Sequence, residues 1–125
     1  MKKLLTVISL MFITLTSFSQ TYFRSNSLYI GNKVSEKSDI YWDKTKIDAN
    51  LLIKLEKNTT TIFSDKVQKY YVIEQKESNK SFARWLCSDL EGKNCYLTVG
   101  SLDDGSLYIS LEYADMAWVY FGNLE

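Results

Sequence analysis

The chain has 125 residues, its 15 lysines and arginines balance 15 aspartates and glutamates, and it contains no histidine. Balanced charge gives no electrostatic reason to bind nucleic acid or an anionic membrane. Without histidine the chain lacks the usual general base, the Ser-His-Asp and Cys-His arrangements and most transition-metal sites. We therefore expect a protein that is not an enzyme, with no cofactor and no metal site.

The first part of the chain, residues 1–19, has the layout of a secretory signal peptide. Two lysines precede an uncharged stretch of apolar and hydroxylic residues, and Ser17 and Ser19 occupy the small positions before a cleavage site. The stretch is too short for a transmembrane anchor, which needs about 20 apolar residues. We predict cleavage near Ser19-Gln20, export to the periplasm or the medium, and no transmembrane segment in the mature chain.

The mature chain, residues 20–125, is long enough for one small domain. Short runs rich in Tyr, Val, Ile, Thr and Trp alternate with turn residues about every 8–12 positions, which is typical of antiparallel β-structure. The expected strands are 27–31, 39–43, 50–56, 60–64, 69–76, 81–88, 94–101, 106–113 and 117–121. We predict an all-β fold, a single antiparallel barrel or sandwich of about seven to nine strands.

One stretch, residues 44–56, is ambiguous between helix and strand. Ile47, Leu51 and Leu55 have the spacing of a helix face, whereas Leu51, Ile53 and Leu55 alternate as in a strand. The residues that follow, 57–60, have the composition of a tight turn, and this favours a hairpin.

The last third of the chain predicts a four-stranded meander. Loops 90–92 and 103–105 each end in glycine, the residue that suits the left-handed position of a three-residue hairpin loop. A third reversal is expected at 114–116. The resulting pairs are Cys87 with Cys95, Trp85 with Leu97, Ala83 with Val99, Val99 with Ile109, Leu97 with Leu111, Cys95 with Tyr113, Leu111 with Val119, and Ile109 with Phe121. This register keeps the apolar side chains on one face.

Cys87 and Cys95 are the only cysteines, and we expect them in an oxidising compartment. Directly opposed residues on antiparallel strands have Cβ atoms about 4.5–5.5 Å apart, near the reach of a disulfide. The pair has neither the CxxC spacing nor the βαβ setting of a redox motif. We predict a structural disulfide.

The face opposite the predicted core carries aromatic and polar side chains, which sugars and proteins often bind. In the predicted register this candidate binding face contains Arg84, Tyr96, Tyr108, Glu112, Trp118 and Tyr120. The alternative is that residues 27–76 cover this face and make it a second half of the core.

The last 45 or so residues resemble a group of small exported bacterial proteins without a characterised activity. Those proteins have a C-x-D-x-x-G-x-x-C hairpin, followed by a Y-x-D turn and a final aromatic strand. Here the hairpin is Cys87-Ser88-Asp89-Leu90-Glu91-Gly92-Lys93-Asn94-Cys95, and the turn is Tyr113-Ala114-Asp115. The resemblance implies no activity and no partner.

We therefore expect a non-catalytic binding or accessory protein that engages an envelope component, a protein or a glycan through a sheet face or loops. A second hypothesis is a carrier of a small lipid or other hydrophobic ligand with a calycin-like barrel, since eight short strands can enclose one small ligand. A third is an inhibitor of a hydrolase. The sequence does not identify the partner or the oligomeric state.

Overall fold

The computed structural model describes residues 20–33, 40–42 and 45–125, and its regular structure there consists of ten β-strands. The predicted signal peptide lies outside the described residues. The strands are β1 (Thr21–Lys33), β2 (Ile40–Trp42), β3 (Ile47–Asp48), β4 (Leu52–Leu55), β5 (Thr59–Phe63), β6 (Gln68–Ser78), β7 (Phe82–Ser88), β8 (Asn94–Ser101), β9 (Leu107–Glu112) and β10 (Met116–Leu124).

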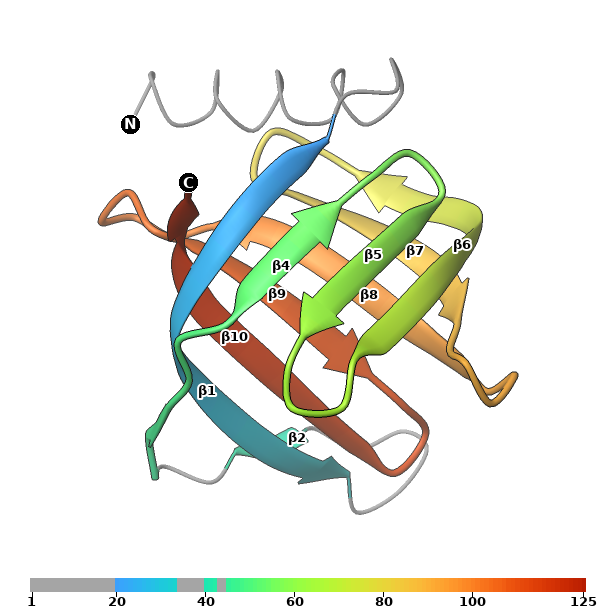
Figure 1. Cartoon of the computed structure of the whole chain (residues 1–125), viewed down its shortest axis with the longest axis horizontal. Helices are drawn as coiled ribbons and strands as arrows, with labels where there is room; N and C mark the ends of the chain where they lie inside the picture. The colour runs from blue at the N-terminus through green and yellow to red at the C-terminus, as the bar shows by residue number, and fades with distance from the viewer. Residues whose placement is uncertain (1–19, 34–39, 43–44) are drawn as a thin grey trace.

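Eight of these strands form a closed antiparallel barrel (Figure 1). Strands β4 to β10 follow one another around the wall in chain order, and β1 closes it by pairing with β10 on one side and β4 on the other. The short strands β2 and β3 pair with the second half of β1. The prediction of a small all-β barrel or sandwich is confirmed, and the structure is a barrel.

Strand β1 has two halves because a β-bulge at Asn26 interrupts its alternation. Its register against β10 shifts between Ser25 and Ser27, so Ser25 faces the interior while Ser27 faces outward. The Ser25 hydroxyl donates to the carbonyl of Ala49 and accepts the N–H of Leu51 at 3.0 Å. These bonds hold the segment before β4 against the bulge.

The hydrophobic core fills the barrel, and every strand from β4 to β10, together with β1, contributes to it. Its fully buried members, each at most 3% exposed, are Phe23, Ile53, Leu55, Ile62, Tyr70, Cys87, Cys95, Leu97, Val99, Leu107, Ile109, Leu111 and Tyr120. Trp85, Tyr113 and Trp118 pack against them, partly buried. Burying apolar side chains on alternate positions of every strand is what drives this closure.

The first two predicted hairpins have the expected register. Cys87 pairs with Cys95 across β7 and β8, and Leu97 pairs with Leu111 across β8 and β9. Gly92 and Gly105 have φ angles of 81° and 101°, the left-handed conformation that their loops require. These registers are confirmed.

The third predicted hairpin is wrong by one residue. Tyr113 and Met116 close a two-residue turn, and the N–H of Tyr113 donates to the carbonyl of Met116 at 2.8 Å. Leu111 therefore pairs with Trp118, and Ile109 pairs with Tyr120. Because side chains alternate along a strand, this shift moves Trp118 and Tyr120 to the interior and Val119 and Phe121 to the outer wall.

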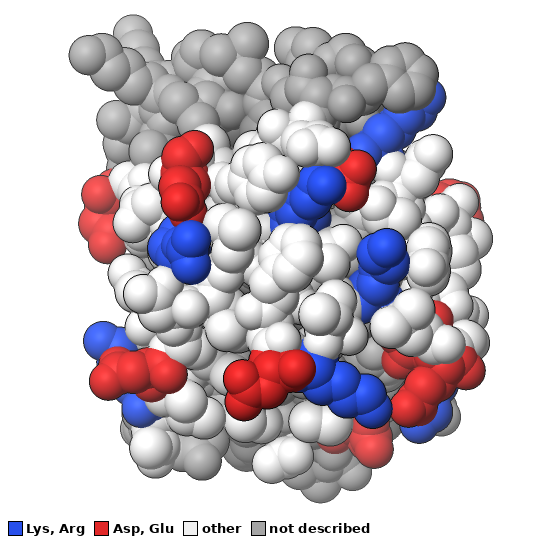
Figure 2. All heavy atoms as spheres, in the orientation of Figure 1, with Lys and Arg blue, Asp and Glu red and all other residues white. Residues whose placement is uncertain are grey.

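The strand boundaries otherwise follow the expectations closely, and the described residues 45–56 contain the strands β3 and β4 and no helix, as favoured. The sequence reasoning missed β3 and the first half of β1. Figure 2 shows acidic and basic side chains interspersed over the face formed by β1, β4 and β5. Among the described residues, no helix has the length and apolar character needed to cross a bilayer.

Candidate functional site

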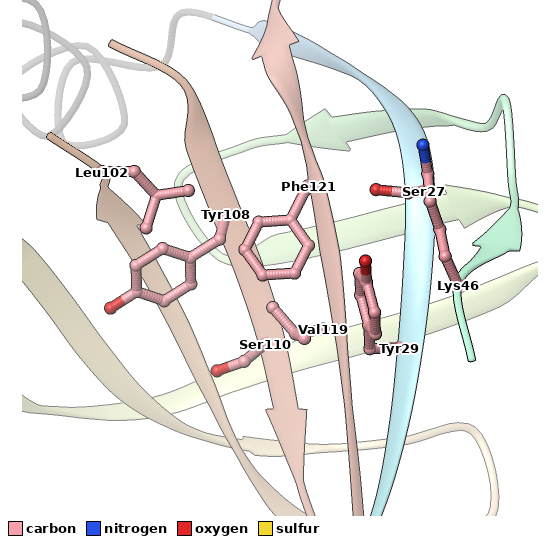
Figure 3. A pocket seen from close by; sticks show the side chains of 8 residues that line it. All are labelled: Ser27, Tyr29, Lys46, Leu102, Tyr108, Ser110, Val119 and Phe121. Atoms are coloured by element: carbon pink, nitrogen blue, oxygen red, sulfur yellow. The ribbon is translucent and has the colours of Figure 1, made fainter. Parts of the chain in front are cut away.

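A groove of about 620 Å³ lies on the outer wall of the barrel (Figure 3). It lies across β9, β10 and the second half of β1. Its lining residues are Ser27, Tyr29, Lys46, Leu102, Tyr108, Ser110, Val119 and Phe121. We call this feature the outer groove.

Two cross-strand rows build the outer groove. Tyr108, Phe121 and Ser27 lie side by side on β9, β10 and β1, and Ser110, Val119 and Tyr29 form the next row. Ser27 and Val119 are buried and form the floor. The rings of Tyr29, Tyr108 and Phe121 are half-buried and form the walls, pointing to the same side of the sheet in Figure 3.

The three rings make a corrugated surface instead of a flat one. Tyr29 meets Phe121 edge-on, with ring centroids 5.6 Å apart and planes at 86°. Tyr108 and Phe121 are tilted by 51°, with centroids 6.5 Å apart. Such edge-to-face contacts stabilise each ring in its position. The groove therefore presents ring faces and edges that are already held in place.

Tyr108 is fixed further by Gly100, its direct partner on β8. The Tyr108 ring lies over this glycine so closely that an added Cβ would come within 2.4 Å of Cζ. Burial raises the pKa of Tyr108, so its hydroxyl stays neutral at physiological pH. A glycine in the strand thus provides the space in which this aromatic wall sits.

The polar groups that line the outer groove are mainly hydroxyls, and one lining residue carries a positive charge. Tyr29, Tyr108, Ser27 and Ser110 bring hydroxyl groups, and Lys46 is the only charged residue among the described lining residues. Lys46 comes from the segment before β3 and stands at the groove's edge beside Ser27 and Tyr29 (Figure 3). An apolar groove with a cation at its rim suits a ligand that combines an apolar group with an anionic one.

The structure separates the six residues of the predicted binding face into three groups. Tyr108 lies in the outer groove. Arg84, Tyr96 and Glu112 lie on the outer wall of β7, β8 and β9, as predicted, but they satisfy one another. Arg84 Nη2 is 3.2 Å from Glu112 Oε2, and the Arg84 guanidinium stands 4.4 Å from the centroid of the Tyr96 ring. We call these three residues the Arg84 cluster.

The remaining two predicted residues, Trp118 and Tyr120, are in the interior, and this corrects their assignment to the binding face. The one-residue shift of the third hairpin accounts for both. Trp118 stacks on Tyr113 with centroids 5.5 Å apart and planes at 23°. Burial raises the pKa of Tyr120, whose side chain is 2% exposed.

Sequence reasoning missed most of the outer groove, including Tyr29, Phe121 and Lys46. Phe121 was placed in the core because the third turn was counted as three residues long. Tyr29 lay in a predicted strand whose partner was unknown. A two-residue turn at Ala114-Asp115 was the one signal that could have revealed Phe121, since it reverses the alternation of β10.

Cys87 and Cys95 are direct partners and fully buried, which confirms their predicted juxtaposition. They are not bonded to each other in this structure. Burial raises the pKa of Cys87 to about 12 and that of Cys95 to about 11. As thiols they are therefore unreactive, since the thiolate is the reactive form.

Comparisons with protein-family models, with curated proteins and with solved structures found no match to this chain. The resemblance to small exported bacterial proteins therefore stays a prediction. Among the described residues, no group of three or more cysteine and acidic side chains is placed to hold a metal ion.

Proposed function

We propose that the mature chain is an exported, non-catalytic binding protein that holds a partner protein in the outer groove. The observation that carries the proposal is the preformed aromatic groove of about 620 Å³ on an otherwise closed barrel. A groove of this size is in the range that takes a small ligand or a few side chains of a partner. Aromatic side chains of this kind commonly anchor protein interfaces.

The ring geometry favours a peptide segment over a glycan. A sugar ring stacks on a flat, exposed aromatic face, whereas the planes of Tyr29 and Phe121 stand at 86° to each other. Aliphatic and aromatic side chains pack against the faces and edges of such rings. The partner segment that we propose therefore presents an apolar or aromatic side chain.

The charge at the rim favours a neighbouring carboxylate on that segment. Lys46 is exposed, and the described lining residues include no acidic side chain. A partner carboxylate beside Lys46 would gain charge complementarity, which fixes orientation and raises the association rate more than the affinity.

Site-specific photo-crosslinking tests the proposal. A benzophenone amino acid replaces Phe121 in one variant, and it replaces Tyr71 in a matched control. Tyr71 is a 44% exposed aromatic on β6, outside the groove. We expect the Phe121 position to give one protease-sensitive adduct of defined mass in the cells that make the protein, and Lys46→Glu to reduce its yield severalfold.

Equal adducts from both positions would contradict a specific groove. A Phe121 adduct that resists protease and contains sugar or lipid would instead assign the groove to a glycan or a lipid, and the proposed partner class would be wrong.

The hypothesis of a calycin-like carrier has support from the barrel architecture but less from its interior. The fully buried core residues fill the space that a carrier keeps for its ligand. The hydrolase-inhibitor hypothesis is one form of the protein-partner proposal, and the mass of the crosslinked partner would test it.

A further inference from the structure

A second pocket lies at one end of the barrel. In an antiparallel barrel every second loop lies at the same end, and here these are the loops β5–β6, β7–β8 and β9–β10, at the lower right of Figure 1. The pocket has a volume of about 220 Å³. It is lined by Lys66, Val67, Gln68, Lys69, Tyr70, Asp89, Leu90, Glu91 and Tyr113. We call it the mouth pocket.

The rim of the mouth pocket includes two large apolar side chains that are open to solvent. Val67 from the β5–β6 loop is 47% exposed, and Leu90 from the β7–β8 loop is 60% exposed. Large exposed apolar side chains on two facing loops are suited to contact the apolar body of a ligand.

The tyrosine hydroxyls at the floor of the mouth pocket already donate hydrogen bonds within the protein. Tyr70 donates its hydroxyl proton to Gln68 Oε1 at 2.6 Å, and Tyr113 donates to Asp89 Oδ2 at 2.8 Å. Gln68 Nε2 in turn donates one N–H to Ser64 Oγ at 3.2 Å. The floor is thus a rigid hydrogen-bonded surface with few donors left.

The donors that remain uncommitted belong to lysines. Within the described part of the chain, the ion pairs engage neither Lys66 nor Lys69. Behind the floor, Trp118 stacks on Tyr113, and its indole N–H is buried without an acceptor in hydrogen-bonding geometry.

The two acidic residues of the lining already have hydrogen-bond or ion-pair partners. Asp89 Oδ1 accepts the N–H groups of Glu91 and Lys93, both at 2.9 Å, and Oδ2 accepts the Tyr113 hydroxyl. Glu91 is 3.8 Å from the Lys93 ammonium. Both carboxylates therefore have partners within their own loop.

We propose that the mouth pocket binds a small organic carboxylate, with its apolar body between Val67 and Leu90 and its charged group facing Lys66 and Lys69. The pocket offers hydrogen-bond donors and cations without committed acceptors, and this matches a carboxylate head group. A volume of about 220 Å³ is enough for a short-chain acid. The proposal does not depend on the outer groove.

Titration of the ¹⁵N-labelled mature protein with hexanoate tests the proposal by amide chemical shifts. We expect shifts at residues 66–70 and 89–91, saturating with a dissociation constant on the order of 1 mM. The double variant K66Q/K69Q should weaken binding about tenfold. Lys80→Gln serves as the matched control, because Lys80 is an exposed lysine in the β6–β7 turn at the opposite end, and it should leave the affinity unchanged.

Hexan-1-ol and hexylammonium have the same chain without the negative charge, and they should bind at least tenfold more weakly than hexanoate. Equal binding of the alcohol would remove the role of the lysines. Shifts confined to Tyr108 and Phe121 would place the acid in the outer groove, and no shift at millimolar hexanoate would refute the mouth pocket as an acid site.

Discussion

This barrel has one aromatic cluster inside and another on its outer wall, and the two differ in how far their neighbours occupy them. Inside, Tyr70, Tyr113, Trp118 and Tyr120 pack against the core, and the first two have hydroxyls committed to neighbouring side chains. The outer groove also presents three aromatic rings, but they form only the walls of an open depression. Similar residues therefore stabilise the fold in one place and remain available for contact in the other.

Strand β10 supplies both clusters, since Trp118 and Tyr120 point inward while Val119 and Phe121 point outward. The Arg84 cluster adds a third case, an outer-wall aromatic whose polar neighbours satisfy one another. An aromatic side chain on a sheet face is thus insufficient evidence of a binding site. What distinguishes the outer groove is open volume beside rings that are already held in place.

We expect the largest effect from Gly122→Ala, because Gly122 sets the approach of β10 to β1. A Cβ at this position would come 2.0 Å from the carbonyl oxygen of Arg24, which is backbone and cannot move aside. We expect loss of closure, with destabilisation above about 4 kcal/mol or failure to fold. Urea denaturation followed by circular dichroism measures it.

Gly100→Ala is the matched control for the glycine in β10. Its Cβ would meet the end of the Tyr108 side chain, which can swing outward, so we expect a cost of about 1 kcal/mol. Equal stability of the two glycine variants would contradict the described closure.

The second prediction compares neighbours on β10. Tyr120→Ala should lower the free energy of unfolding by about 3–5 kcal/mol, since it removes a fully buried aromatic. Phe121→Ala, on the outer wall, should cost about 1 kcal/mol. Urea midpoints of the two variants provide the test, and a larger loss for Phe121 would restore the register predicted from the sequence.

The third prediction concerns Cys87 and Cys95 in exported material. We expect the protein to be two hydrogens lighter than the dithiol form by mass spectrometry. Reduction should lower its stability by about 2.5 kcal/mol, because the bridge closes a loop of about nine residues in the unfolded chain. Two thiols that alkylate after unfolding, without prior reductant, would contradict the disulfide.

The smallest expected effect concerns Asp89. Burial opposes its charge, but the hydrogen bonds from Tyr113, Lys93 and Glu91 prevail and lower the pKa of Asp89 below its usual value near 3.9. Its stabilisation is therefore fully present above about pH 4–5 and is lost as the pH falls through the pKa of the folded state.

Tyr113→Phe removes one of those donors and should cost about 1 kcal/mol at pH 7. The difference from the parent protein should shrink at a low pH, below the lowered pKa of Asp89, where this carboxyl is protonated in both. Urea midpoints at both pH values measure it, and a difference independent of pH would assign the cost to packing.

Strand register could be predicted from the sequence where two kinds of signal coincide. In the hairpins β7–β8 and β8–β9, glycines that need a left-handed φ mark the loops, and the alternation of apolar residues allows one register only. At Ala114-Asp115 no glycine marks the turn, so its length could not be counted from residue types. The assignment of Trp118 and Tyr120 depended on that count.

The outer groove was less accessible from the sequence because it depends on long-range pairing. Tyr29 reaches Phe121 only because β1 pairs with β10, and the bulge at Asn26 reverses the alternation before Tyr29. A bulge leaves no pattern by which a single sequence would identify it. Lys46 has its place because the next residue, Ile47, pairs with Leu28 on β1.

The contact between the first and last strands of the barrel also governs when the molecule can complete its fold. Arg24 pairs with Glu125 at 2.9 Å, 101 positions apart, and the N–H of Glu125 donates to the carbonyl of Tyr22. A chain that emerges from its amino end must therefore leave β1 unpaired with β10 until β10 has itself emerged. During that interval the unpaired edges are open to self-association, and a folding helper that shields them would act on the nascent meander.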